Sequence, residues 1–118
     1  MPPKSRVLIV EDDPAFRAAL ARLLVRMGHE VRAVATAAEA LVTTSEWSPH
    51  HLLLDVVLPD ESGLSVLRAV RRQQLPTRVA IMTALQLTPE SPEVAEWKPE
   101  AVVNKPLDVF TLGAWLAS

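Results

Sequence analysis

The chain has 118 residues, enough for one domain with a single buried core. Hydrophobic residues make up 49% of it and charged residues 22%, a balance typical of a folded soluble protein rather than a disordered one. The formal net charge of -2 indicates no basic surface for nucleic acid or anionic membranes, and the lack of cysteine excludes disulfides and thiolate metal sites.

The N-terminal residues resemble neither a signal peptide nor a membrane anchor. Residues 1–6 are polar, include two prolines and lack the apolar stretch of a secretory signal. No apolar run approaches the roughly 20 residues that a membrane-spanning helix needs. We therefore expect a cytoplasmic protein without direct contact to nucleic acid or membrane. We also expect residues 1–118 to form one domain, with no output domain in this chain.

The chain begins with a predicted strand and helix. Residues 6–10 (RVLIV) form a short apolar run rich in β-branched side chains, which is typical of a buried strand. Asp13 can cap the free amides of a following helix, and Pro14 suits its first position. Apolar residues then recur at helical spacing until Gly28, a residue favoured just beyond a helix C-terminus.

A second strand and helix follow the same order. Residues 30–35 (EVRAVA) predict a strand. Thr36 with Glu39 three residues later forms a capping box, which predicts a helix to about Trp47, and Pro49 stops it.

The third unit has a charged residue inside an apolar run. Residues 52–57 predict a buried strand in which Asp55 is the one charged side chain. Residues 59–63 predict a loop, and a helix follows over about 63–74, with leucine and valine on one side and arginines on the other.

The last third predicts two more strands and a final helix. The strands cover residues 78–83 and 100–105, and the helix covers residues 107–117. Residues 86–99 should hold the fourth helix but carry Pro89, Pro92 and Pro99. We expect that helix to be short, displaced or partly melted, which would make it atypical. Strands that alternate with helices through five rounds predict an α/β fold, a doubly wound five-stranded parallel sheet covered on both faces.

Polar residues gather at the carboxyl ends of the predicted strands. The acidic residues 11–13 follow the first strand, and Asp55, Thr83 and Lys105 end the third, fourth and fifth. Ligands of open parallel sheets bind at this edge, so we expect these side chains to share one crevice.

Such a cluster favours a hard metal ion and phosphoryl chemistry. Carboxylates held close together repel each other, and oxygen ligands suit Mg²⁺ or Mn²⁺. A carboxylate can also act as a nucleophile towards phosphorus, while an amine and a hydroxyl can stabilise the transferring phosphoryl oxygens. Each residue alone is weak evidence, because acidic residues after strands are often helix caps or turn residues. Their joint occurrence in this order is what favours the functional interpretation.

The chain resembles the receiver domain of bacterial response regulators from Arg6 to Ala117. Four segments carry the resemblance: VLIVEDDP (7–14), LLLDVVLPDESGL (52–64), AIMTA (80–84) and VNKP (103–106). It implies a flavodoxin-like (βα)5 fold with strand order 2-1-3-4-5. It also implies a two-component signalling role, in which a histidine kinase or phosphotransfer protein supplies the phosphoryl group. The output partner is unspecified, and a homodimer is possible.

The resemblance assigns roles residue by residue. Asp55 matches the phosphoacceptor, Asp12 a direct metal ligand, and Glu11 a residue that acts on the metal through water. The backbone carbonyl of Val57 matches a further metal ligand. A second group completes the site: Thr83 matches the hydroxyl that moves to the phosphoryl group, Lys105 matches the amine that pairs with its oxygens, and Pro106 is expected to follow a cis bond.

Three positions depart from the family pattern. Val102 stands where relatives carry an aromatic residue that reports phosphorylation, so the usual aromatic rotation cannot transmit the signal. Val57 and Leu85 are apolar at positions that influence how water reaches the acyl phosphate. We therefore hypothesise a drier site and a longer-lived phosphoryl group.

Two further pairs of residues have simpler interpretations. His50 and His51 lie at the start of the third strand, opposite the acidic cluster, and we interpret them as structural rather than as metal ligands or phosphohistidines. Trp97 and Trp115 fit either an exposed patch for a partner or the core.

Two other functions remain open. An aspartate-nucleophile phosphatase would need a general acid two residues after Asp55, where the chain has Val57. We therefore do not expect this protein to be an enzyme that acts on a separate substrate. We expect it to catalyse only its own phosphorylation and dephosphorylation. The main alternative is a degenerate receiver that binds partners without being phosphorylated.

Overall fold

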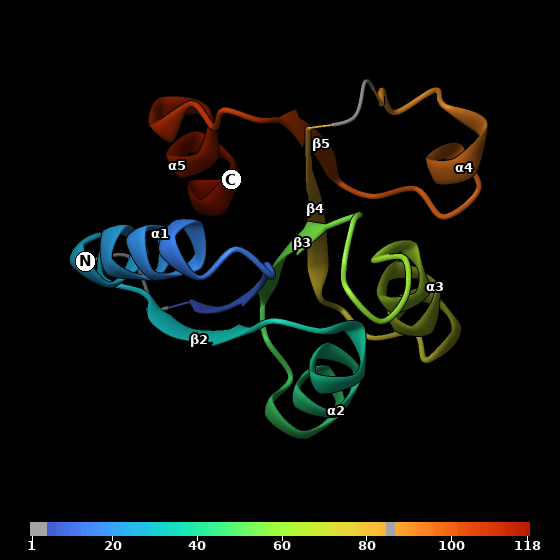
Figure 1. Ribbon diagram of the computed structural model, residues 1–118, viewed down its shortest axis with the longest axis horizontal. Helices are drawn as coiled ribbons and strands as arrows, with labels where there is room; N and C mark the ends of the chain where they lie inside the picture. Colours follow the sequence, from blue (N-terminus) through green and yellow to red (C-terminus); the bar gives the residue numbers. More distant parts are fainter. Residues whose placement is uncertain (1–4, 85–86) are drawn as a thin grey trace.

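The computed structural model describes residues 5–84 and 87–118, and over these residues five strands alternate with five helices (Figure 1). The strands are β1 (Arg6–Val10), β2 (Glu30–Val34), β3 (His51–Asp55), β4 (Arg78–Thr83) and β5 (Ala101–Asn104). The helices are α1 (Pro14–Arg26), α2 (Ala37–Trp47), α3 (Leu64–Arg72), α4 (Pro92–Ala95) and α5 (Val109–Ala117).

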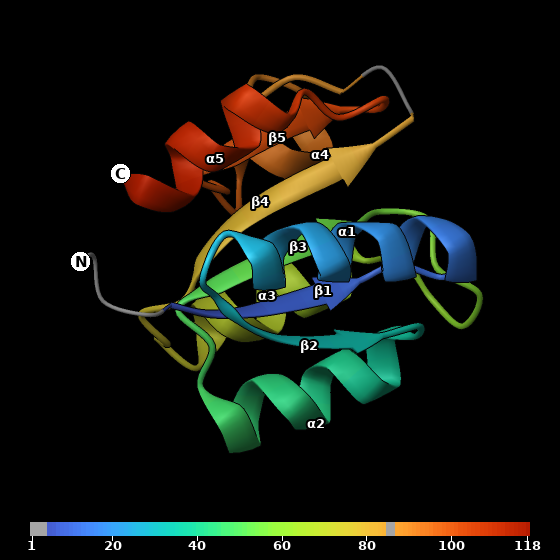
Figure 2. The ribbon, with the colours of Figure 1, turned by 90° about the vertical axis from the view of Figure 1, so that its left-hand side faces the viewer.

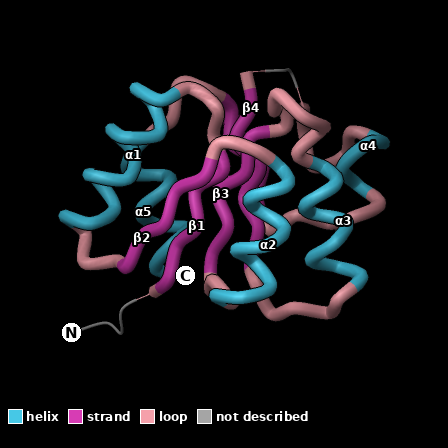
Figure 3. Tube along the Cα trace, turned by 60° about the horizontal axis from the view of Figure 1, so that its bottom comes forward, coloured by secondary structure: helices cyan, strands magenta, loops and turns pink. Residues whose placement is uncertain are grey.

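All strand pairs are parallel, and the sheet order is β2-β1-β3-β4-β5. This confirms the predicted α/β class and strand order. Helices α1 and α5 cover one face of the sheet, while α2, α3 and α4 cover the other (Figures 2 and 3). Each face has its own apolar cluster, and the inner strands β1, β3 and β4 contribute to both.

The helix starts follow the predicted local chemistry. The Asp13 carboxylate accepts hydrogen bonds from the amides of Ala15 (3.0 Å) and Phe16 (3.3 Å), and Pro14 is the first residue of α1. The Thr36 hydroxyl accepts a hydrogen bond from the Glu39 amide, which confirms Thr36 as the helix cap, and donates one to the Glu39 carboxylate, so the Glu39 side chain meets the hydroxyl of the cap and not its amide.

Several element boundaries differ by one or two residues from the sequence-based expectation. β3 ends at Asp55 rather than at residue 57, because the Asp55 carboxylate accepts a hydrogen bond from the Val57 amide at 3.0 Å and turns the chain. Val56 stays buried after the turn, which is why the apolar run looked like a longer strand. The fourth helix spans Pro92–Ala95 in the structure, and whether it is atypical stays a prediction.

Trp97 and Trp115, for which the sequence left a surface patch and the core open, both pack against the core. Trp97 lies partly buried against the cluster on the α2–α3 side, and Trp115 lies partly buried against the cluster on the α1–α5 side. Arg72 lies over the ring of Trp97, and Arg78 lies over the ring of Trp115, which covers apolar surface with guanidinium groups. Neither tryptophan therefore forms an exposed patch of its own.

The two histidines lie at the opposite end of β3 from Asp55. Nδ1 of His50 accepts a hydrogen bond from the Arg6 amide at 2.9 Å, and the buried His51 packs edge-on against Trp115, with 5.1 Å between ring centroids. These contacts support the structural interpretation. Among the described residues, no helix is long and apolar enough to span a membrane.

Gly63 is predicted to be intolerant of any side chain. A Cβ there would overlap the backbone carbonyl of Asp55, and the Gly63 amide already donates to the Val56 carbonyl at 2.7 Å. We expect Gly63→Ala to lower the free energy of unfolding by about 1–3 kcal/mol in urea denaturation, because the backbone must move. Gly113→Ala in α5 is the matched control, since its Cβ would meet only the flexible tip of Met27 at 3.3 Å. Equal losses in the two variants would contradict this account.

The stability of the protein should depend on the protonation of His51. Burial, helped by the nearby charge of Arg78, lowers the pKa of His51 from 6.5 to about 4. The unfolded chain therefore binds this proton more tightly than the folded chain does. The contribution of neutral His51 to the free energy of unfolding is fully present above pH 6.5 and is lost as the pH drops towards 4. We expect His51→Phe, which keeps an aromatic ring, to remove about 2–3 kcal/mol of that pH dependence in denaturation curves at pH 7 and pH 4. An unchanged pH dependence would show that His51 does not cause it.

Candidate functional site

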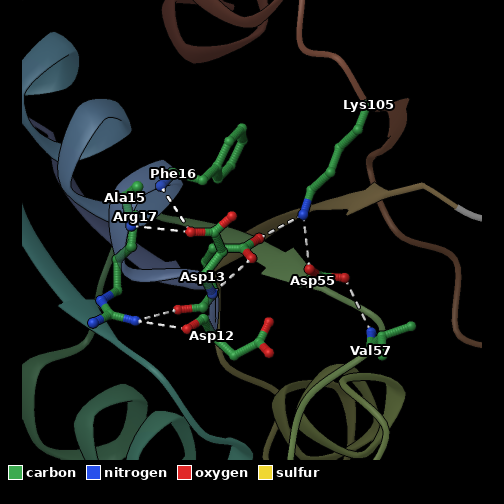
Figure 4. A network of polar contacts seen from close by, with 9 residues as sticks. Asp12, Asp13, Ala15, Phe16, Arg17, Asp55, Val57 and Lys105 are labelled. Atoms are coloured by element: carbon green, nitrogen blue, oxygen red, sulfur yellow. Dashed lines mark hydrogen bonds and ion pairs between the residues drawn. The ribbon is translucent and has the colours of Figure 1, made fainter.

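Three strands deliver polar side chains to one edge of the sheet. Glu11 follows β1, Asp55 is the last residue of β3, and Lys105 follows β5. Because the strands are parallel, their carboxyl ends lie at the same edge, and the two carboxylates come from neighbouring strands. Figure 4 shows the Lys105 side chain reaching down to Asp55 from above.

The structure brings together the three predicted acidic residues. One carboxylate oxygen each from Glu11, Asp12 and Asp55 lies within 4.8 Å of the others, which is close enough to share a metal ion. Glu11 is 1% exposed and Asp55 5%, while Asp12 is exposed at the mouth of the site. Carboxylates in this arrangement suit a hard divalent cation that keeps part of its water shell.

Lys105 bridges the two buried carboxylates. Its Nζ atom donates to Oε2 of Glu11 at 2.7 Å and to Oδ2 of Asp55 at 2.9 Å. The same ammonium lies 4.7 Å from the ring centroid of Phe16, so an aromatic face completes its surroundings. From the sequence, Phe16 is only one of the apolar residues that recur at helical spacing in α1.

The environment raises the pKa values of Glu11 and Lys105. Burial raises the pKa of Glu11, and the neighbouring Asp55 adds to the effect, while the hydrogen bond from Lys105 opposes it. Burial alone would lower the pKa of Lys105, but its hydrogen bonds to Glu11 and Asp55 outweigh that effect and raise it. Lys105 therefore stays protonated at neutral pH and neutralises part of the acidic cluster.

Asp13, the cap of α1, and Arg17, within α1, hold Glu11 and Asp12 in place. The Asp13 amide donates to Oε1 of Glu11 at 3.1 Å, and Arg17 Nη1 donates to the carbonyls of Glu11 at 2.8 Å and Asp12 at 3.3 Å (Figure 4). Sequence reasoning missed Arg17. The only feature of the sequence that pointed to this role was the position of Arg17, a positively charged residue in the first turn of the helix that follows the acidic residues.

The remaining predicted site residues lie at the same edge of the sheet. Thr83 is fully buried at the end of β4, and its carbonyl accepts a hydrogen bond from the Lys105 amide at 2.8 Å. The Lys105–Pro106 bond is cis, as expected. Val57 is 58% exposed, and Val102 lies partly buried against the apolar cluster on the α2–α3 side. Leu85 lies outside the described residues.

Asp60 was also missed by the sequence analysis. Its carboxylate accepts hydrogen bonds from the amides of Ala37 and Ala38, both at 3.0 Å, at the start of α2. These two bonds lower the pKa of Asp60, so the carboxylate is ionised at neutral pH.

Comparison with known proteins gives relatives of one kind. The chain is 29% identical over 106 residues to the DNA-binding transcriptional regulator NtrC of Azospirillum brasilense, covering 90% of this chain and 22% of that protein. It is 39% identical over 79 residues to the transcriptional regulatory protein TcrA of Mycobacterium tuberculosis, covering 67% and 31%. The chain thus spans about a fifth to a third of the length of these two relatives.

Solved structures of similar sequence share the fold. A CheY-like response regulator receiver domain from Methanospirillum hungatei superimposes with a TM-score of 0.87 at 26% identity, covering 97% of this chain and 91% of that one. A response regulator from Chloroflexus aurantiacus gives 0.86 at 27% identity, covering 97% and 95%. The sequence profile of the response regulator receiver domain matches residues 7–116, nearly the whole chain. With its strand order and its acidic edge, the chain therefore belongs to the family of response regulator receiver domains.

Proposed function

We propose that this protein accepts a phosphoryl group on Asp55 in a two-component relay and signals by a change of conformation. Family membership supports the signalling class. The observation that carries the finer proposal is the position of Asp55: its carboxylate lies beside two other carboxylates and accepts a hydrogen bond from an ammonium at 2.9 Å. That setting supplies positive charge beside the nucleophile and the reacting atoms.

The proposed reaction moves one phosphoryl group. A carboxylate oxygen of Asp55 attacks phosphorus, a P–O bond forms, and the P–N bond to a phosphohistidine of the kinase or phosphotransfer protein breaks. The imidazole leaves with the electron pair of that bond and takes up a proton. With acetyl phosphate as donor, acetate leaves instead. Water attack on the phosphorus of the acyl phosphate later restores the carboxylate.

A divalent cation fits the acidic residues that the structure brings together. Asp12 and Asp55 would hold Mg²⁺ or Mn²⁺ directly, Glu11 would act through water, and the Val57 carbonyl would be a further ligand, as in the family. The bound cation would supply positive charge that offsets repulsion between the carboxylates and the incoming phosphoryl oxygens. Arg17 and the Asp13 amide keep the chain of the acidic pair in place for this task.

Lys105 and Thr83 would act on the phosphoryl oxygens. Lys105 is shared between Glu11 and Asp55, so it can turn towards a phosphoryl group on Asp55 without leaving the site. Thr83 lies on the strand next to β3 and can supply a hydroxyl donor. Because Val57 rather than an acidic residue stands two positions after Asp55, we propose no turnover of separate phosphate esters.

The setting of this reaction is also part of the proposal. We expect a cytoplasmic histidine kinase or phosphotransfer protein as donor. The relatives named above are transcriptional regulators, which favours transcription as the output of a longer protein or partner. A homodimer of the phosphorylated form is a further expectation. Val102 in β5 packs against the cluster on the α2–α3 side. The change of conformation must therefore be transmitted from the site to the output partner without an aromatic residue at that position.

Intact-mass spectrometry tests the chemistry directly. Incubation with acetyl phosphate and Mg²⁺ should add one phosphoryl group to the wild-type protein and none to Asp55→Asn, because only a carboxylate at this position can form the acyl phosphate. A chelator should abolish the addition. No adduct on folded, metal-bound protein, with either acetyl phosphate or a phosphorylated kinase, would favour the phosphorylation-independent receiver. The decay of the adduct in the same samples measures the lifetime that Val57 is expected to prolong.

Lys105 should oppose the metal while it assists the phosphoryl transfer. Lys105→Met removes a cation that competes for Glu11 and Asp55, so we expect Mg²⁺ affinity in titration calorimetry to rise about tenfold. Phosphorylation by acetyl phosphate should instead slow by on the order of 100-fold, because a donor to the transition state is lost. Lys98→Met makes the same charge change on an exposed residue near the end of α4 and should leave both values unchanged. Unchanged affinity in Lys105→Met would contradict the competition.

A further inference from the structure

The loop between Asp55 and α3 is closed at its base. This phosphoacceptor loop comprises residues 56–63. The Val57 amide donates to the Asp55 carboxylate at 3.0 Å at one end, and the Gly63 amide donates to the Val56 carbonyl at 2.7 Å at the other. Gly63 approaches the Asp55 carbonyl so closely that no side chain fits. Any displacement of the loop would therefore move the backbone of Asp55 and Val57.

The middle of the phosphoacceptor loop is attached to a different helix. Both carboxylate oxygens of Asp60 accept hydrogen bonds from the first two amides of α2, Ala37 and Ala38, at 3.0 Å each. Thr36 caps the next free amide, that of Glu39, at 3.1 Å. Asp60 thus caps two free amides of α2, as Thr36 caps a third. Asp60 is 23 residues from Ala37 and 22 residues from Ala38 in the sequence.

The attachment is strong for an exposed contact. A carboxylate that accepts two backbone amides at a helix N-terminus forms charge-assisted hydrogen bonds and interacts favourably with the helix dipole. The low pKa of Asp60 is consistent with this contact, and the carboxylate keeps its charge at neutral pH. The first turn of α2 is itself anchored, because Ala37 and Ala40 are buried in the cluster on that face of the sheet. Asp60 therefore connects the loop to a fixed part of the fold.

We infer that Asp60 is a positioning residue for the metal and phosphoryl site, because it holds the phosphoacceptor loop, and with it Asp55 and Val57, against the N-terminus of α2. This inference rests on the proposed function, which makes Asp55 and the Val57 carbonyl metal ligands. Asp60 itself does not belong to the acidic cluster. By linkage, a cation bound at Asp55 should in turn stabilise the hydrogen bonds at the start of α2.

The test compares three variants. Asp60→Ala removes both acceptors, Asp60→Asn keeps one side-chain oxygen without the charge, and Glu61→Ala removes a neighbouring exposed charge that has no part in the contact. We expect Asp60→Ala to weaken Mg²⁺ binding about tenfold in titration calorimetry, Asp60→Asn less, and Glu61→Ala less than twofold. In hydrogen exchange of the metal-free proteins, Asp60→Ala should expose the amides of Ala37, Ala38, Val57 and Gly63, and Glu61→Ala should not.

The two readouts separate this inference from the proposed function. If wild-type protein binds no Mg²⁺, the proposed function fails, but exchange in the metal-free protein still decides whether Asp60 orders the loop. Faster exchange at Ala37 and Ala38 alone, with Val57 and Gly63 unchanged, would overturn the inference, because Asp60 would then be only a helix cap. Equal Mg²⁺ affinities for wild type and Asp60→Ala would overturn it as well. Asp60→Asn keeps the test valid if the alanine variant fails to fold.

Discussion

Two carboxylates, on Glu11 and Asp55, are buried side by side and share one ammonium, that of Lys105. Burying one unpaired charge would already be costly, and burying two of the same sign more so. The arrangement persists because Lys105 contacts both carboxylates, and because the sheet fixes the ends of β1, β3 and the chain after β5 at one edge. The face of the Phe16 ring lies against the same ammonium and adds a cation–π contact to this pairing.

The same pairing leaves the acidic cluster with a net negative charge. Positive charge from Lys105 balances the site when no other cation is there, yet only in part, since three acidic residues face one lysine. Burial raises the pKa of Glu11, and the neighbouring Asp55 raises it further. A divalent cation would offset the remaining negative charge, and a phosphoryl group would find positive charge already in position. The Arg17 side chain holds the backbone carbonyls of Glu11 and Asp12. The Gly63 amide holds the carbonyl of Val56, the residue after Asp55.

The sequence predicted the architecture well because its signals were local. The apolar runs, the Asp13 and Thr36 caps and the alternation of strands with helices each depend on neighbouring residues, and they lead to the sheet order that the structure shows. The acidic residues of the site could be predicted from their place after strands. Contacts between distant residues could not be predicted. Asp60 lies in the loop expected over residues 59–63, and nothing nearby in the sequence indicates its contact with the start of α2. The end of β3 was misplaced for a related reason, since Val56 is buried in a loop rather than in a strand.

The ion pair between Lys105 and Glu11 joins residues that are 94 positions apart. β1, β3, β4 and β5 must all be in the sheet before these two side chains can meet, because β5 is added at the edge beyond β4, and β4 pairs with β3. A chain still leaving the ribosome would display Glu11 and Asp55 well before Lys105 had been synthesised. The two buried carboxylates consequently have no ammonium partner from this pair until β4 and the chain after β5 have joined the sheet.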